Sequence, residues 1–135
     1  SGAARGLRHR STGPVRAPKP RPCALATLLA MSRRPDLRLS VAAGLTVVTG
    51  STSVPSTSRG WIHKVGNEGI IKVVVDADRG VLVGATSVGP TGGEVLSGLA
   101  VAVRGAVPVA TLKNMIYAYP TIWRGIEAAI QDTGL

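Results

Sequence analysis

The clearest hydrophobic pattern along the chain is a pair of alternating apolar segments in GIIKVVVDADRGVLVGATSV, residues 69–88. Alternation with a period of two is typical of strands, and the DADRG segment between them is typical of a turn, with Gly80 suited to a positive φ. The pattern predicts an antiparallel hairpin. The first strand is expected to carry Ile71, Val73 and Val75 on one face and Ile70, Lys72, Val74 and Asp76 on the other.

Upstream of this hairpin, GLTVVTGS at residues 44–51 predicts another short strand. The segment that follows, STSVPSTSRGWIHK, alternates small polar residues with apolar ones. Because proline cannot donate a backbone hydrogen bond, Pro55 indicates either an edge strand or a break.

The segment GPTGGEVLSGLAVAVRG predicts a helix over about residues 91–105. Its apolar face is expected to hold Val95, Leu96, Leu99 and Val103. Thr91 as N-cap and Glu94 three residues later match a capping box, and Gly105 is a plausible stop. The small residues of this helix would let it approach another surface closely; they are Ser97, Gly98, Ala100 and Ala102.

The C-terminal segment predicts two more helices. The first is short, in VPVATLKNMI, with Pro108 near its first turn. The second follows AYPT, where Pro120 blocks any upstream helix and Thr121 is a good N-cap. Its buried face is expected to hold Ile122, Ile126 and Ile130.

This order of elements predicts an α+β fold. Strands come first and helices afterwards, which favours an antiparallel sheet of about three to five strands with two or three helices on one face. The composition agrees, since 44% of the residues are hydrophobic but only 3% are aromatic. The core must therefore be built mainly from valine, leucine, isoleucine and alanine.

The net charge of +9 belongs to the N-terminal part of the chain. Residues 1–38 hold nine of the sixteen basic residues and one of the seven acidic residues. We therefore predict a basic, disordered tail over residues 1–40 and a folded domain over residues 41–135. Within the tail, CALATLLAMSRR is compatible with a short helix. A transit peptide is the weaker interpretation of an Arg-rich, acid-poor N-terminus.

Several kinds of chemistry are not expected. Cys23 is the only cysteine, so no internal disulfide is possible. The two histidines, His9 and His63, and this cysteine lie far apart in the sequence, which argues against a structural zinc site. The longest apolar run is too short to cross a bilayer. GPTGG matches no phosphate-binding motif. Gly92 and Gly93 could face an anion at a helix start, but close helix–sheet packing is the simpler explanation.

A longer resemblance emerges when these elements are taken together. NEGIIKVVVDADRGVLVGATSVGPTGGEVLSGLAVAV, followed by MIYAYPTI, resembles the C-terminal dimerisation domain of the FAD-dependent pyridine nucleotide-disulfide oxidoreductases. That family includes glutathione reductase, dihydrolipoamide dehydrogenase and mercuric reductase. The resemblance covers about residues 44 to 133 and implies a homodimer. It also implies a parent protein with separate FAD and NAD(P) domains, so this chain alone is expected to bind no cofactor and to be inactive.

The resemblance draws attention to the loop before the last helix. In the disulfide reductases this loop resembles His-Pro-Thr, with a glutamate five residues after the histidine. Here Tyr119 stands at the histidine position, before Pro120 and Thr121, and Arg124 stands at the glutamate position. Tyrosine, with an ordinary pKa of about 10, is a poor base, and arginine cannot accept a proton.

These replacements favour the mercuric-reductase-like branch, which tolerates tyrosine at this position. Tyr119 is thus the candidate catalytic residue. The competing interpretation is a half-buried aromatic that anchors the loop. Trp61 and Trp123 are expected to fill the core or an interface, and His63 to lie at the surface.

Two other classes of function remain as alternatives. A small nucleic-acid-binding protein would act through the Arg-rich tail alone, because residues 39–135 offer no stacking platform of interleaved basic and aromatic residues. A stand-alone enzyme is disfavoured by the missing nucleotide-binding fingerprint. We expect a cytoplasmic homodimer with no membrane contact.

Overall fold

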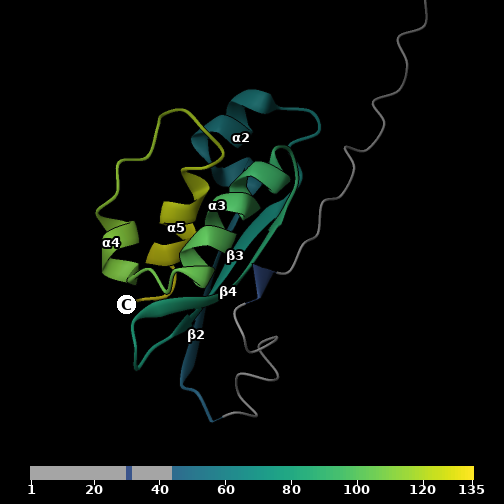
Figure 1. Ribbon diagram of the computed structural model, residues 1–135. Coiled ribbons are helices and arrows are strands. Elements are labelled where there is room, and N and C mark those ends of the chain that lie inside the picture. The colour runs from purple at the N-terminus through teal and green to yellow at the C-terminus, as the bar shows by residue number, and fades with distance from the viewer. Residues whose placement is uncertain (1–29, 32–43) are drawn as a thin grey trace, which may run out of the picture.

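The computed structural model describes residues 30–31 and 44–135, so the expectations for the rest of the tail, with Cys23 and His9, lie outside the described residues. Within this part of the chain one antiparallel sheet has the order β1-β4-β3-β2 (Figure 1). Its strands are β1 (Ala30–Met31), β2 (Val47–Ser53), β3 (Ile70–Asp76) and β4 (Val81–Val88). The helical elements are η1 (Val54–Ser56), α2 (Ser58–His63), α3 (Gly92–Arg104), α4 (Val109–Lys113) and α5 (Gly125–Gln131).

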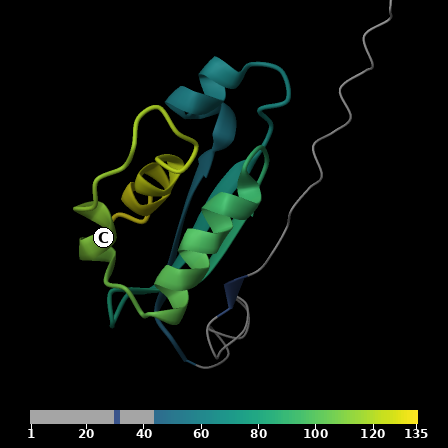
Figure 2. The same ribbon diagram turned by 45° about the horizontal axis from the view of Figure 1, so that its top comes forward.

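The predicted α+β class is confirmed. Helices α3 and α5 lie on one face of the sheet, α3 against β4 and α5 against β2 and β3 (Figure 2). The short helices α2 and α4 lie toward opposite ends of this layer. At Ala30–Met31 the structure has a strand paired to β4, so the helix suggested for that segment is wrong at these two residues.

The predicted hairpin is confirmed in its strands, its turn and its buried face. Val73 pairs with Ala85, and Gly80 has φ 60°. Ile71, Val73 and Val75 are all fully buried.

Asp76 departs from the strand pattern. It was expected on the face opposite Val75, yet it is fully buried. Its Oδ1 accepts hydrogen bonds from the backbone N–H groups of Asp78 and Arg79, each at 3.1 Å. The carboxylate therefore turns back under the hairpin turn, as aspartate commonly does, instead of following the strand alternation.

The segment after β2 was predicted as an edge strand or a break, and only the break at Pro55 is confirmed. The chain forms η1 and then α2, a helix that the alternating pattern did not indicate. Thr57 accounts for this helix, since its Oγ1 accepts from Gly60 N at 3.0 Å and donates to the Val54 carbonyl at 2.7 Å. Gly60 lies against that same carbonyl, where a Cβ would clash.

The capping box predicted at the start of α3 is wrong. Thr91 occupies the N-cap position, but it has φ 54° and ψ 20°, and its side chain makes no capping hydrogen bond. A normal N-cap has extended backbone, which aims its oxygen at the first turn. Left-handed backbone turns the Thr91 hydroxyl away, and Glu94 is left exposed.

Gly105 is confirmed as the C-cap of α3, but the left-handed residue is Ala106, with φ 48°. Val107 N donates to the Ala102 carbonyl at 2.9 Å, and Ala106 N donates to the Val103 carbonyl at 3.2 Å. This pair of bonds is the Schellman arrangement, in which the left-handed position usually holds glycine.

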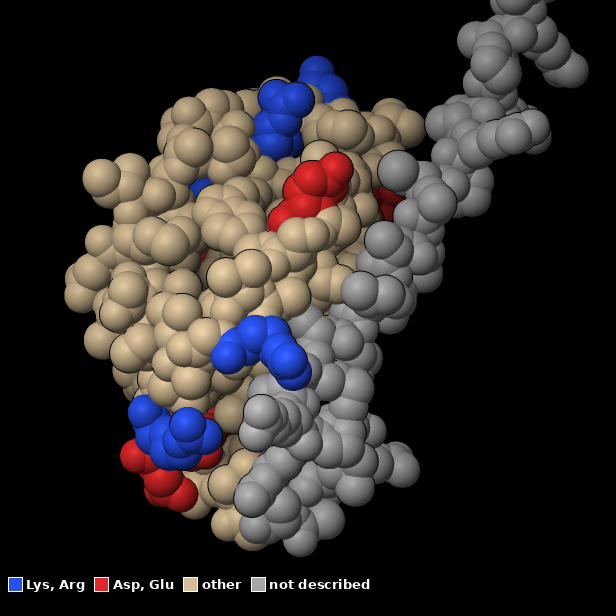
Figure 3. Space-filling view, in the orientation of Figure 1, with Lys and Arg blue, Asp and Glu red and all other residues tan. Residues whose placement is uncertain are grey.

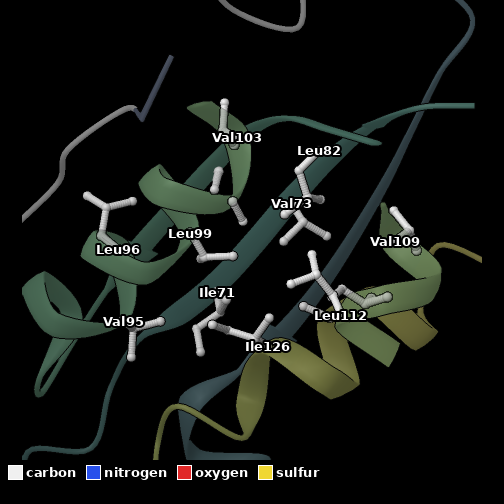
Figure 4. Close-up of a cluster of buried hydrophobic side chains, with 14 of the residues drawn as sticks. Ile71, Val73, Leu82, Val95, Leu96, Leu99, Val103, Val109, Leu112 and Ile126 are labelled. Atoms are coloured by element: carbon white, nitrogen blue, oxygen red, sulfur yellow. The ribbon is translucent and has the colours of Figure 1, made fainter. Parts of the chain in front are cut away.

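The core is aliphatic, as the composition predicted. Figure 4 shows Leu99 of α3, Ile71 and Val73 of β3 and Ile126 of α5 meeting over the sheet. The expected apolar faces of α3 and of the terminal segment are confirmed as buried. The buried members are Val95, Leu96, Leu99, Val103, Ile122, Ile126 and Ile130.

Tyr117 is the one aromatic residue buried in this core. It is 7% exposed, and its hydroxyl donates to the Leu112 carbonyl at 2.9 Å. Burial, reinforced by the negative charge of Glu127, raises the pKa of Tyr117 to about 12. The phenol is thus held in its neutral form by the fold.

The left-handed backbone of Ala106 leads to a stability prediction. Alanine at positive φ is strained by about 1 kcal/mol, whereas glycine is not, although glycine loses more entropy on folding. Ala106→Gly is therefore expected to raise the free energy of unfolding by up to about 1 kcal/mol in urea denaturation. Gly105→Ala, at helical φ, should change it by less than about 0.5 kcal/mol. Destabilisation by Ala106→Gly would contradict the assignment.

The bonded, buried phenol of Tyr117 leads to a pH prediction. Because its folded pKa lies above the ordinary value of about 10, its contribution to stability is complete below pH 10 and is lost as the pH rises toward 12. Tyr117→Phe should lower stability at pH 7 by about 1 kcal/mol and flatten the decline between pH 10 and pH 12. The measurement is chemical denaturation at a series of pH values.

The matched control for Tyr117→Phe is Tyr119→Phe, because Tyr119 is 64% exposed. This control should alter neither the stability at pH 7 nor the alkaline decline. An equal effect of the two substitutions would contradict the buried role of Tyr117.

Candidate functional site

The segment between α4 and α5 is a loop pinned at two buried points. Tyr117 is held on one side, and Ile122, 5% exposed, enters the core on the other. Between them Ala118, Tyr119 and Pro120 are exposed. The loop reaches the end of the molecule where α2 lies (Figure 1). Its exposed tip is therefore presented from fixed supports.

Tyr119, the candidate catalytic residue, is at this tip. It is 64% exposed and precedes Pro120 through a cis peptide bond. Its ring faces the Arg124 guanidinium, with Cζ 5.6 Å from the ring centroid, a distance at which a cation interacts favourably with an aromatic face. The interpretation of Tyr119 as a half-buried anchor is wrong, because Tyr117, two residues earlier, has that role.

Arg124, at the position of the family's glutamate, connects the loop to α5. Its Nε lies 3.1 Å from Oε2 of Glu127, one helical turn along. Its backbone N donates to Thr121 Oγ1 at 3.3 Å. Tyr119, Arg124 and Glu127 thus form a row in which the guanidinium is in contact with both an aromatic ring and a carboxylate.

Glu127 was not among the residues selected from the sequence. The signal that could have found it is the i, i+3 spacing of Arg124 and Glu127, which places opposite charges on one side of a helix. Its carboxylate contacts Arg124, so an acid of α5 lies beside the loop, but that acid is in an ion pair.

Thr121 is not the N-cap of the terminal helix. Helix α5 begins at Gly125, and its N-cap is Arg124, whose side chain makes no capping bond. Thr121 Oγ1 accepts from Arg124 N and donates to the Ala118 carbonyl at 2.6 Å. The Thr121 hydroxyl therefore accepts from a backbone N–H three residues on, as an N-cap does, but this bond closes a turn ahead of the helix.

Two grooves flank the loop, and Thr121 lines both. The hydroxyl groove has a volume of about 320 Å³ and is lined by Thr52, Ser56, Ser58, Thr121, Arg124 and Glu127, with further residues of α5. The tryptophan groove has a volume of about 330 Å³. Its apolar lining is Pro90, Val95, Pro120, Ile122 and Trp123, and its polar lining includes Arg59, His63 and Glu94.

The two tryptophans differ in environment. Trp123 is partly buried against the core, and its ring occupies the space that a Cβ on Gly98 would fill. The predicted close approach to the small residues of α3 is therefore confirmed, and Trp123 does fill a packing site. Trp61, in contrast, is 73% exposed on α2.

Of the two glycines that open α3, Gly92 is used in packing, whereas nothing lies within 4 Å of the Cβ position of Gly93. Gly92 N donates to the Gly89 carbonyl at 3.0 Å, and Gly92 lies against Ser87. The explanation by close helix–sheet packing is therefore confirmed for Gly92.

His63 is exposed, as expected. Among residues 30–31 and 44–135, no group of three or more His, Cys, Asp or Glu side chains is arranged to hold a metal ion. No helix in this part of the chain is long and apolar enough to span a bilayer.

Comparison with known proteins gives consistent relatives. Residues 40–130 match the model of the pyridine nucleotide-disulphide oxidoreductase dimerisation domain. Mercuric reductase of Shigella flexneri is 35% identical over 63 residues, 47% of this chain and 11% of that protein. Dihydrolipoyl dehydrogenase of Thermus scotoductus is 36% identical over 66 residues, 49% of this chain and 14% of that protein.

Solved structures agree on the fold. LpdA of Mycobacterium tuberculosis superposes with a TM-score of 0.65 at 21% identity, covering 79% of this chain and 24% of LpdA. The flavoprotein disulfide reductase RclA of Escherichia coli gives 0.66 at 14% identity, covering 73% of this chain and 22% of RclA. The chain thus spans only a small part of the length of these relatives. Because the family model matches more than half of it, the chain belongs to the dimerisation-domain family of the pyridine nucleotide-disulphide oxidoreductases.

Proposed function

We propose that this chain is the homodimerisation module of a FAD- and NAD(P)-dependent oxidoreductase of the mercuric-reductase-like branch. The family match over residues 40–130 and the mercuric reductase relative support this assignment. In the proposal, residues 41–135 are the module, residues 1–40 are a basic tail, and the parent protein works in the cytoplasm. The cofactors bind to other parts of the parent, where FAD would supply the redox chemistry.

The observation that carries the proposal is the exposed Tyr119 between two buried supports. Tyr117 and Ile122 hold the loop, and Tyr119 is 64% exposed. Among the described residues, no hydrogen bond engages the Tyr119 hydroxyl. A fixed loop with a free phenol suits a residue that is offered to a second copy of the protein, whose reacting groups it would approach.

The side chains around Tyr119 suit positioning and proton donation more than base catalysis. A phenol can donate or accept a hydrogen bond, while arginine only donates. Arg124 lies against the ring, and Glu127 contacts Arg124. In the proposed complex, Tyr119 donates its proton in a hydrogen bond to substrate, and Arg124 holds the ring at a constant angle.

The nucleic-acid alternative has no support in the family match or in the relatives named above. The excess positive charge lies in residues 1–38, whereas residues 39–135 hold seven of the sixteen basic residues against six of the seven acidic ones. A nearly neutral folded part offers little attraction to a phosphate backbone.

Self-association is the first expected property. The full chain should form a dimer at micromolar concentration, with an interface of at least about 1,000 Å². Sedimentation equilibrium over a range of concentrations measures this. The proposal would be contradicted if the chain stayed monomeric even at concentrations about 100-fold higher than this.

Loss of the Tyr119 hydroxyl is the second test. In the full-length parent, Tyr119→Phe is expected to lower turnover by about 100-fold, the lower range for a positioned proton donor, with flavin content and dimerisation unchanged. Steady-state kinetics together with the flavin absorbance spectrum provide the measurement. Turnover equal to that of the parent would remove Tyr119 from the catalytic residues and leave the loop as a structural element.

A further inference from the structure

The tryptophan groove has the size and the lining of a site for a small molecule. Its volume of about 330 Å³ lies at the lower end of the range for such sites, about 300–1,000 Å³. Its apolar lining comes from two segments far apart in the sequence, Pro90 with Val95 and Pro120 with Ile122 and Trp123. Small-molecule sites are mostly apolar and carry a few polar groups that orient the ligand. The apolar part of this groove therefore suits the body of a ligand.

Trp123 forms a fixed aromatic wall of the groove. Its ring atoms Cη2 and Cζ3 occupy the space that a Cβ on Gly98 would fill, so α3 holds the indole from one side. Ile122, the preceding residue, is anchored in the core at 5% exposed. A wall that is already ordered loses little conformational entropy when a ligand binds. Aromatic rings pair favourably with one another, so this wall favours a ligand with a ring.

The rim of the groove carries opposite charges that do not neutralise each other. Arg59 of α2 and Glu94 of α3 both line the groove, and both are exposed. Within residues 30–31 and 44–135, neither of them takes part in an ion pair, whereas Arg124 and Glu127 do. Both charges are therefore available to a ligand that lies between them.

The α2 side of the rim is suited to a carboxylate. Arg59 and His63 are four residues apart on α2, so both face the groove that they line. A guanidinium donates in a fork that fits a carboxylate, and an imidazole can donate one bond more. The helix itself is held in place, because Thr57 Oγ1 accepts from Gly60 N at 3.0 Å and the Asn67 amide donates to the Gly60 carbonyl at 2.8 Å.

The α3 side of the rim is suited to a cation. Glu94 lies in the first turn of α3 and lines the groove. Figure 3 shows basic side chains over the upper end of the molecule, near α2, and an acidic region below them with uncharged surface between. A ligand with one charge would be attracted by one side of the rim and repelled by the other. A ligand with both a carboxylate and an ammonium group satisfies both sides.

We propose that the tryptophan groove binds a free aromatic amino acid. The ring of the ligand lies against Trp123, its carboxylate meets Arg59 and His63, and its ammonium group meets Glu94. A free amino acid carries both charges on the carbon that bears its side chain, whereas a residue inside a peptide carries neither. The site lies within one chain and uses none of the chemistry assigned to Tyr119, so it goes beyond the proposed function.

Binding in this groove would also reach the candidate loop. Pro120 and Thr121 line the groove, and Thr121 Oγ1 donates to the Ala118 carbonyl at 2.6 Å. A bound amino acid would therefore contact α2, α3 and the loop together. Because a ligand that binds only the folded chain shifts the equilibrium away from unfolding, it raises the midpoint of thermal unfolding.

Fluorescence of Trp123 measures the binding directly. The chain has two tryptophans, and Trp61, 73% exposed and outside the groove, is replaced by phenylalanine so that Trp123 alone emits. L-Phenylalanine is the probe, because it does not emit when tryptophan is excited selectively. We expect a saturable change with a Kd of about 1 mM, as is usual for a small ligand in an open groove, and a higher midpoint of thermal unfolding. No response up to about 50-fold above this Kd would overturn the proposal.

Three analogues of the probe separate its groups. N-Acetyl-L-phenylalanine lacks the ammonium charge and L-phenylalaninamide lacks the carboxylate, while both keep the ring. Each should bind about three- to fivefold more weakly than L-phenylalanine, as expected for the loss of one exposed ion pair. L-Alanine keeps both charges but has no ring, and it should give no saturable change. If either charge-deleted analogue bound as tightly as L-phenylalanine, the assignment of a free amino acid would be overturned.

Substitutions on the rim test which side meets which charge. Arg59→Gln should weaken L-phenylalanine about three- to fivefold without weakening L-phenylalaninamide, and Glu94→Gln should weaken L-phenylalanine equally without weakening N-acetyl-L-phenylalanine. The matched controls are Arg104→Gln and Glu68→Gln, which remove exposed charges outside the groove and should leave the Kd within about twofold. Circular dichroism checks that each variant folds. Controls that weaken binding as much as the rim variants would overturn the site.

Discussion

The contact of α5 with the sheet at two glycines sets the geometry of the C-terminal half of the domain. A Cβ on Gly50 of β2 would meet the Ala129 carbonyl, and a Cβ on Gly125 would lie 2.8 Å from Cδ1 of Ile71. Without these two side chains, α5 comes close enough for Ser51 N to donate to Asp132 Oδ2 at 2.8 Å. Ile126 is carried into the core by the same approach.

The position of α5 determines the loop that precedes it. Once Gly125 lies on Ile71, the preceding turn must place Ile122 in the core and Trp123 over Gly98. The chain between Tyr117 and Ile122 has no freedom to fold inward, so Tyr119 is displayed at the surface. Packing deep in the domain thus controls an exposed residue at its edge.

The exposed loop and α2 share one end of the domain. Thr121 lines both the hydroxyl groove and the tryptophan groove. One residue of the loop therefore forms a wall of each groove.

The sequence by itself determined the hairpin of β3 and β4, the apolar face of α3 and the family of the chain, because these depend on local periodicity and on the order of short motifs. The capping box failed since spacing says nothing about φ, and Thr91 takes left-handed backbone where Gly92 packs on Ser87. Only the tertiary structure decided which tyrosine is buried and which tryptophan is exposed. Local sequence does not distinguish Tyr117 from Tyr119. Burial depends on how the chain folds back on itself, which brings the Leu112 carbonyl to Tyr117 and the bare backbone of Gly98 to Trp123.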